Sequence, residues 1–193
     1  EPSPKIEDNF NDATSTGARA LLKVDLNDNW TITPGIMFQN TETNGTWGHD
    51  PEDLGDLKAS RFFEDSTKED WYQATMTVEG QIGEMDLVYA GAYLDRNMDS
   101  LYDYSGYAEY LEQYYAGYYD CYVYDSLGGC LDPSQYVSGD ENFTRASNEL
   151  RLQSDQSKRF RWIAGIFTQQ QLHSFDLQWR IPAMESSGSV IPG

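Results

Sequence analysis

The fold is decided by residues 18–39, which read ARALLKVDLNDNWTITPGIMFQ. Up to Leu26, and again from Trp30 onward, apolar and polar side chains alternate with a period of two. This is the pattern of a β-strand with one apolar and one polar face. Residues 27–29 between the two stretches read NDN and favour a tight polar turn. The whole stretch therefore predicts a β-hairpin.

Two further pairs of alternating stretches follow. The second pair encloses residues 80–83, which read GQIG, and the third encloses residues 154–158, which read SDQSK. The pattern predicts an all-β chain of about six antiparallel strands arranged as three hairpins. The predicted strands lie near residues 18–26, 30–39, 71–79, 84–95, 145–153 and 160–169.

The connections between these strands are strongly asymmetric. Short turns close each hairpin, whereas long links at residues 40–70 and 96–144 join the hairpins, and a third long segment begins at 170–193. Compact soluble domains seldom carry structureless loops beyond about 12–15 residues. Outer-membrane barrels combine short periplasmic turns with long extracellular loops. We therefore expect residues 1–193 to be a partial transmembrane β-barrel domain.

The faces of the predicted strands agree with this expectation. One face is small or apolar, and the other carries residues such as Arg19, Gln73, Glu79 and Arg151. Lipid outside and a wet lumen inside require such a division. The alternative is a soluble antiparallel sheet with one face in water, which alternates in the same way. The one-sided loop lengths are what favour the barrel.

Composition excludes several classes of partner. The chain has 13 basic and 32 acidic residues, a net charge of −19, which argues against nucleic-acid binding. Its 14 Tyr, 8 Phe and 5 Trp argue against disorder, because disordered chains are poor in aromatic residues. No window approaches 18 consecutive apolar residues, so we expect no transmembrane helix.

Cys121 and Cys130 are the two cysteines, and they lie in a stretch rich in Gly and Tyr. A local disulfide is the simpler interpretation and implies an oxidising compartment. The alternative is two buried thiols in a cytosolic protein. The sequence offers no catalytic constellation and no well-supported set of metal ligands. We therefore expect no enzymatic activity, no cofactor and no metal site.

The most unusual segment is the tyrosine-rich one between the second and third hairpins. Spacings of three and four among Tyr107, Tyr110, Tyr114 and Tyr118 predict a short helix. Tyrosine supplies rigid, amphipathic contact area, as binding loops do. We hypothesise that the segment forms part of an outer ligand vestibule; the alternative is that the rings pack on one another to keep a long loop compact. The candidate residues are Tyr102, Tyr104, Tyr107, Tyr110, Tyr114 and Tyr118.

The third hairpin carries a resemblance to a known family. Residues 148–154 read NELRLQS and residues 161–167 read RWIAGIF. This order resembles the barrel region of TonB-dependent receptors, as do residues 30–39 and the tyrosine-rich loop that ends in a cysteine pair; the resemblance covers about residues 15–170. It implies a bacterial outer-membrane location, contact with the lipid bilayer and lipopolysaccharide, and uptake of a scarce nutrient such as a siderophore, a vitamin or an oligosaccharide.

The sequence also departs from that family. It contains neither the N-terminal plug domain nor the segment that contacts TonB, so TonB would be bound by a segment outside this chain. Six strands are fewer than the eight of the smallest closed single-chain barrel. We therefore expect a middle portion of a longer barrel. The alternative functions are a secreted or surface β-sandwich that binds carbohydrate, and a passive outer-membrane channel.

Overall fold

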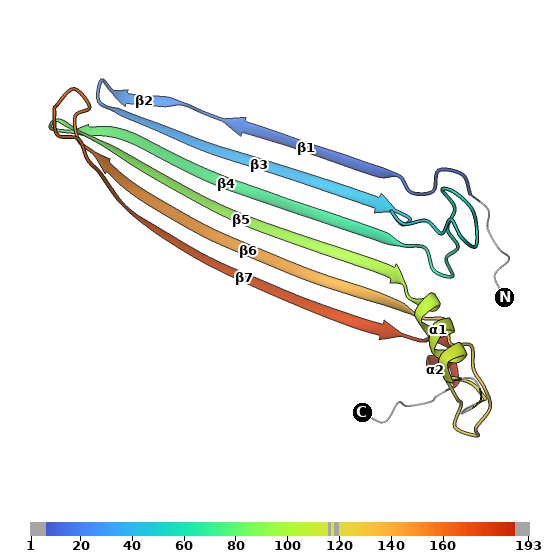
Figure 1. The fold of residues 1–193 in the computed structure, drawn as a ribbon. Helices are drawn as coiled ribbons and strands as arrows, with labels where there is room; N and C mark the ends of the chain where they lie inside the picture. The colour runs from blue at the N-terminus through green and yellow to red at the C-terminus, as the bar shows by residue number, and fades with distance from the viewer. Residues whose placement is uncertain (1–6, 116, 118–119, 188–193) are drawn as a thin grey trace.

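The chain folds into one antiparallel sheet with two helices at one end (Figure 1). The computed structural model describes residues 7–115, 117 and 120–187. Within them the elements are β1 (Ala13–Leu21), β2 (Val24–Asn27), β3 (Trp30–Asn44), β4 (Ser66–Ile82), β5 (Met85–Asp103), α1 (Ser105–Tyr115), β6 (Tyr136–Gln153), β7 (Ile163–Arg180) and α2 (Pro182–Ser187). The all-β, antiparallel class is confirmed.

The sheet is open. Its strand order is β1-β3-β4-β5-β6-β7, with β2 also paired to β3, and it does not close into a barrel. Strands β1 and β7 therefore form its two edges, on opposite sides of the view in Figure 1. No helix among the described residues is long and apolar enough to cross a membrane.

Pro34 explains why the predicted strand at 18–26 is divided into β1 and β2. The pairing with β3 keeps the same register across the break, with Leu21 opposite Gly35 and Val24 opposite Ile32, and it shifts only beyond Asp25. Between them the backbone N–H of Leu22 donates to the carbonyl of Pro34 at 3.0 Å. Proline has no N–H to return the second hydrogen bond of this pair, so the ladder is interrupted there.

The three short turns lie together at one end of the sheet, and the long connections lie at the other (Figure 1). Gly83 in the turn between β4 and β5 has a φ of 64°, a conformation in which glycine has no steric penalty. The third turn is longer than predicted, because β7 begins at Ile163 and not at Phe160. Ser154 closes this turn: its N–H donates to the Trp162 carbonyl, and its hydroxyl accepts from the Trp162 N–H.

The strands continue well past their predicted ends on the side of the long connections. Strands β3 to β7 have 15 to 19 residues each, and the connections shrink to residues 45–65 and 104–135. The prediction of a loop over all of 170–193 is wrong, since β7 runs to Arg180. The strand ends that were missed are polar on much of both faces. They lack the alternation that marks a strand although their hydrogen-bond ladder continues.

The strand register confirms which residues share a face. One row across the sheet joins Ile36, Ala74, Tyr93 and Ala146. The fourth predicted strand is rich in apolar residues on both faces, so its alternation alone does not say which face belongs to the apolar surface. Its neighbour decides this, because Tyr89 lies opposite Val78. We call the resulting surface the apolar band. On β3 to β6 it consists of Trp30, Ile32, Pro34, Ile36, Phe38, Tyr72, Ala74, Met76, Val78, Leu87, Tyr89, Gly91, Tyr93, Ala146, Leu150 and Leu152.

The apolar band ends at nearly the same height on four neighbouring strands. On β3 and β4 it ends at Phe38 and Tyr72, whose row already holds Asp95 on β5 and Thr144 on β6. The row beyond joins Asn40, Asp70, Asn97 and Asn142. The side-chain amide of Asn97 donates to Asp70 at 3.3 Å, and that of Asn142 donates to Asn97 at 2.8 Å. Within the band, Asn148 accepts a hydrogen bond from the Tyr89 hydroxyl at 2.7 Å, which satisfies one polar atom on an apolar surface.

Candidate ligand site at the loop end

Apart from Ser154 in the third turn, the buried residues among those described gather where the long connections meet the sheet. Asp65 is 5% exposed, and its carboxylate accepts from the Asp103 N–H at 2.7 Å and from Arg61 Nε at 3.0 Å. Its backbone carbonyl accepts from the Gly45 N–H at 2.7 Å. The connection between β3 and β4 is thereby fixed to the end of β5.

The same junction positions α1. The Asp103 carboxylate accepts from the N–H of Ser105 at 2.9 Å, which places negative charge at the helix N-terminus, where it is stabilising. The Gln135 backbone, just before β6, pairs with this turn: its carbonyl accepts from the Tyr104 N–H at 2.9 Å, and its N–H donates to the Ser105 hydroxyl at 3.3 Å. Helix α1 therefore leaves the sheet in a fixed direction.

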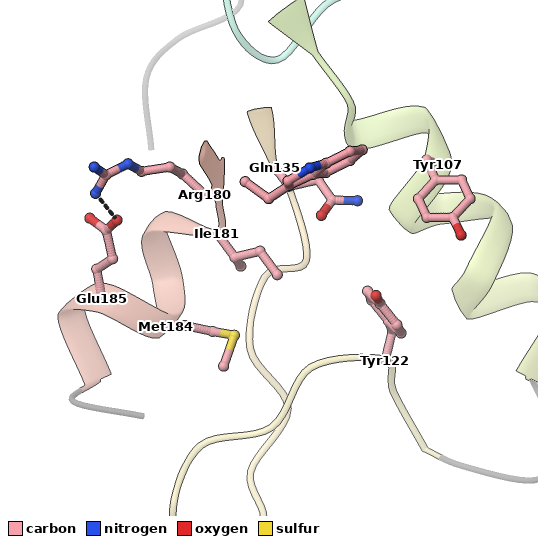
Figure 2. Close-up of a pocket in the computed structure, with 8 residues that line it drawn as sticks. Tyr107, Tyr122, Gln135, Arg180, Ile181, Met184 and Glu185 are labelled. Atoms are coloured by element: carbon pink, nitrogen blue, oxygen red, sulfur yellow. Dashed lines mark hydrogen bonds and ion pairs between the residues drawn. The ribbon is translucent and has the colours of Figure 1, made fainter. Parts of the chain in front are cut away.

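A cavity of about 400 Å³ lies beside this junction (Figure 2). We call it the outer pocket. It brings together α1, the segment before β6, the end of β7 and α2. Its lining residues are Tyr107, Tyr122, Gln135, Trp179, Arg180, Ile181, Met184 and Glu185.

Trp179 is the largest aromatic residue of the outer pocket. Its ring meets that of Tyr104 nearly edge to face, with 4.6 Å between centroids and 76° between planes, a favourable aromatic geometry. Trp179 lies opposite Val137 on β6, on the face of the sheet that lies away from the apolar band. The outer pocket therefore borders the polar face at its loop end.

The charged groups of the outer pocket neutralise each other. Arg180 donates to the Glu185 carboxylate at 2.9 Å, as Figure 2 shows. This hydrogen bond and the attraction of the carboxylate raise the pKa of Arg180. The nearby connection at 104–135 is acidic: it contains Glu109, Glu112, Asp120, Asp125 and Asp132 and no Lys or Arg. The outer pocket is thus a neutral site beside a negative loop.

The structure divides the six candidate vestibule tyrosines. Tyr107 lines the outer pocket and Tyr104 supports Trp179. Tyr102 lies at the end of β5, where its hydroxyl is 3.2 Å from that of Thr67. Both residues line a second cavity, of about 90 Å³. Tyr110 and Tyr114 stack on each other, with centroids 6.0 Å apart. Tyr118 lies outside the described residues.

Both interpretations of the tyrosines are therefore represented, since some rings line a cavity and others pack together. The helix predicted from their spacing is present as α1. The role of these residues in ligand binding stays a prediction.

The disulfide between Cys121 and Cys130 is present, with 5.8 Å between the Cα atoms. It closes a small loop in which Tyr124 and Cys130 form an antiparallel bridge. Cys121 immediately precedes Tyr122, so the crosslink helps to hold this ring at the outer pocket.

The lining residues from Trp179 to Glu185 were not singled out from the sequence because 170–193 was predicted as a loop, and Tyr122 and Gln135 were not singled out within the predicted loop at 96–144. The available signal was at the end of β7, where Phe175, Leu177 and Trp179 put apolar side chains on one face after Gln169, Gln171 and His173. No known protein family, curated protein or solved structure matches this chain.

Proposed function

We propose that this sheet is a segment of a transmembrane β-barrel of the bacterial outer membrane, and that the barrel is a TonB-dependent receptor for a scarce nutrient. The observation that carries the membrane part is the apolar band, which ends at nearly the same height across β3 to β6. A soluble sheet has no reason to end its apolar surface along one line.

The length of the apolar band fits a bilayer. On β3, where it is longest, it runs from Trp30 to Phe38, which is close to the about 9–11 residues that a tilted strand needs to cross the hydrocarbon core; on β4 to β6 it is shorter. Phe38, Tyr72 and Tyr93 stand near its border with the polar rows, and Trp30 stands at the turn end. Aromatic residues form girdles at both surfaces of such barrels. The parts of β3 to β6 beyond the border would project outward from the membrane.

The polar face fits a wet lumen. Arg96 pairs with Glu69 at 3.0 Å, and His173 lies 3.2 Å from Glu141, all on the face away from the apolar band. Charged residues in barrels of this kind line the interior.

The two open edges support the idea that other strands complete the barrel. Lipid does not tolerate unpaired backbone groups, and the outer edges of β1 and β7 have no partner strand among the described residues. The choice of a TonB-dependent receptor rests on the resemblance of residues 148–167, and the alternative that must be separated from it is a passive channel. The single-layered sheet does not favour the alternative of a soluble β-sandwich.

Cysteine labelling of the full-length protein in intact cells tests the topology. Leu127→Cys lies in the connection before β6, where Leu127 is 94% exposed, and Asp28→Cys lies in the first short turn. We expect a membrane-impermeant maleimide to label Leu127→Cys in intact cells and Asp28→Cys only after the outer membrane is opened. Labelling of both in intact cells would contradict the membrane assignment.

Binding to the periplasmic domain of TonB tests the receptor part. We expect the immobilised domain to retain the full-length protein. Correct labelling without retention would leave the passive channel as the function.

A further inference from the structure

We infer that the outer pocket binds an uncharged sugar ring, so that the nutrient is a neutral saccharide. This inference rests on the proposed function for the position of the pocket on the cell exterior. The binding chemistry itself is argued from the lining residues.

The aromatic residues supply an apolar surface for the ligand. Tyr107 and Tyr122 face the cavity from α1 and from the disulfide-closed loop (Figure 2), and Trp179 of β7 also lines it. Tyr104 holds the Trp179 ring from its side, yet 56% of Trp179 remains exposed. Aromatic rings of this kind are apolar on their faces and polar at one tip. A sugar ring is complementary, because its C–H groups form an apolar face and its hydroxyls project from the edge.

Gln135 supplies a buried polar group. The residue is only 4% exposed, and Figure 2 shows its carboxamide directed toward the space between Tyr107 and Tyr122. Its Nε2 reaches the Tyr104 carbonyl only at 3.5 Å, and its Oε1 accepts no hydrogen bond from the described residues. A carboxamide both donates and accepts. A hydroxyl group of a ligand satisfies it as no purely apolar ligand does.

The charges select against an anionic ligand. An anion would be repelled by the acidic connection at 104–135, and Arg180, the one basic residue of the lining, is already paired with Glu185. The Arg180–Glu185 pair instead presents donors and acceptors side by side without net charge. The hydroxyl groups of a sugar can accept from the donors and donate to the acceptors. The cavity of about 400 Å³ lies in the range of small-ligand sites, so it accommodates a short saccharide unit and not a large complex.

Glycan binding by the full-length protein in detergent tests the inference. An array of neutral, acidic and basic glycans is probed first, and the best neutral glycan is then titrated by isothermal titration calorimetry. We expect a neutral glycan to bind, with affinity at least tenfold lower in Trp179→Leu and several-fold lower in Gln135→Leu. Phe62→Leu is the matched control, because Phe62 is an exposed aromatic residue of the 45–65 connection that does not line the outer pocket, and the affinity of this variant should be unchanged.

Three results would overturn the inference: no neutral glycan bound at millimolar concentration, equal affinity in Trp179→Leu and Phe62→Leu, or preference for choline or a ferric catecholate over every neutral glycan. Gln135→Met guards against misfolding, since it keeps the length of the buried side chain and adds no charge, and it should lose the same several-fold in affinity. The two proposals fail separately. Loss of glycan binding with correct maleimide labelling removes only the saccharide, whereas glycan binding without that labelling removes the membrane receptor.

Discussion

A lysine at position 76 tests the apolar band directly. Met76 lies in the middle of the band on β4, opposite Pro34 on β3 and Gly91 on β5, and is 38% exposed. Its neighbour Thr77 points to the polar face, opposite Thr33 and Ala90. Met76→Lys therefore puts a charge toward the proposed lipid, and Thr77→Lys puts the same charge, one residue away on the same strand, toward the proposed lumen.

The two variants should differ greatly in a bilayer. Lysine on the lipid face at the midplane costs roughly 2–4 kcal/mol. Because about 1.4 kcal/mol corresponds to a tenfold change, the unfolding equilibrium constant of Met76→Lys should rise about 30- to 800-fold. Thr77→Lys stays in the aqueous lumen and should change the free energy of unfolding by less than about 0.5 kcal/mol.

The measurement is equilibrium unfolding of the full-length protein in phospholipid vesicles, followed by tryptophan fluorescence in guanidinium. Met76→Leu serves as the control for packing, since a swap of similar volume costs less than about 1.5 kcal/mol. In a sheet with both faces in water, the two lysines would behave alike. Equal free energies of unfolding for Met76→Lys and Thr77→Lys would therefore refute the apolar band as a lipid-facing surface.

Two more predictions concern single hydrogen bonds. Tyr89→Phe removes the donor to Asn148 and should lower the free energy of unfolding in vesicles by about 1–3 kcal/mol. The double variant Tyr89→Phe/Asn148→Leu should recover this loss, because it leaves no unpaired polar group. An unchanged stability of Tyr89→Phe would show that water reaches this site. The N–H of Ser157 lowers the pKa of Asp155 from its usual 3.8, so the carboxylate stabilises the third turn fully above pH 3.8 and loses this effect as pH falls through the lowered pKa. Hydrogen exchange of the Ser157 amide should accelerate only in that acidic range, and Asp155→Asn should abolish this pH dependence.

The hairpins were predictable because the apolar band imposes a period of two on each strand that carries it. Thr75 and Thr77 alternate with Ala74 and Met76 over the whole predicted strand of β4, and the register pairs them as the alternation requires. Even the ambiguous β5 becomes clear once Tyr89 is placed opposite Val78.

The alternation did not predict the polar extensions of the strands. Asn97 and Asn142 pair across two strands that were predicted to be a single loop at 96–144. Their side chains hydrogen-bond to each other, so neither face needs to be apolar there. The outer pocket depends on these extensions, because Trp179 reaches Tyr104 only if β7 continues to Arg180. A contact between residues this far apart in sequence has no local signature.

The sheet buries little of its own surface. The chain exposes 14278 Å², whereas a globular protein of its 22.0 kDa mass exposes about 9,300 Å². Among the described residues, the buried hydrophobic side chains are Ala108, Val123 and Val137, all at the loop end. A sheet with one layer, two open edges and its apolar side chains exposed has no core of its own to offset the entropy of folding. Under the proposed function, lipid on the apolar band and partner strands at β1 and β7 would supply the missing burial on the surfaces that are left uncovered.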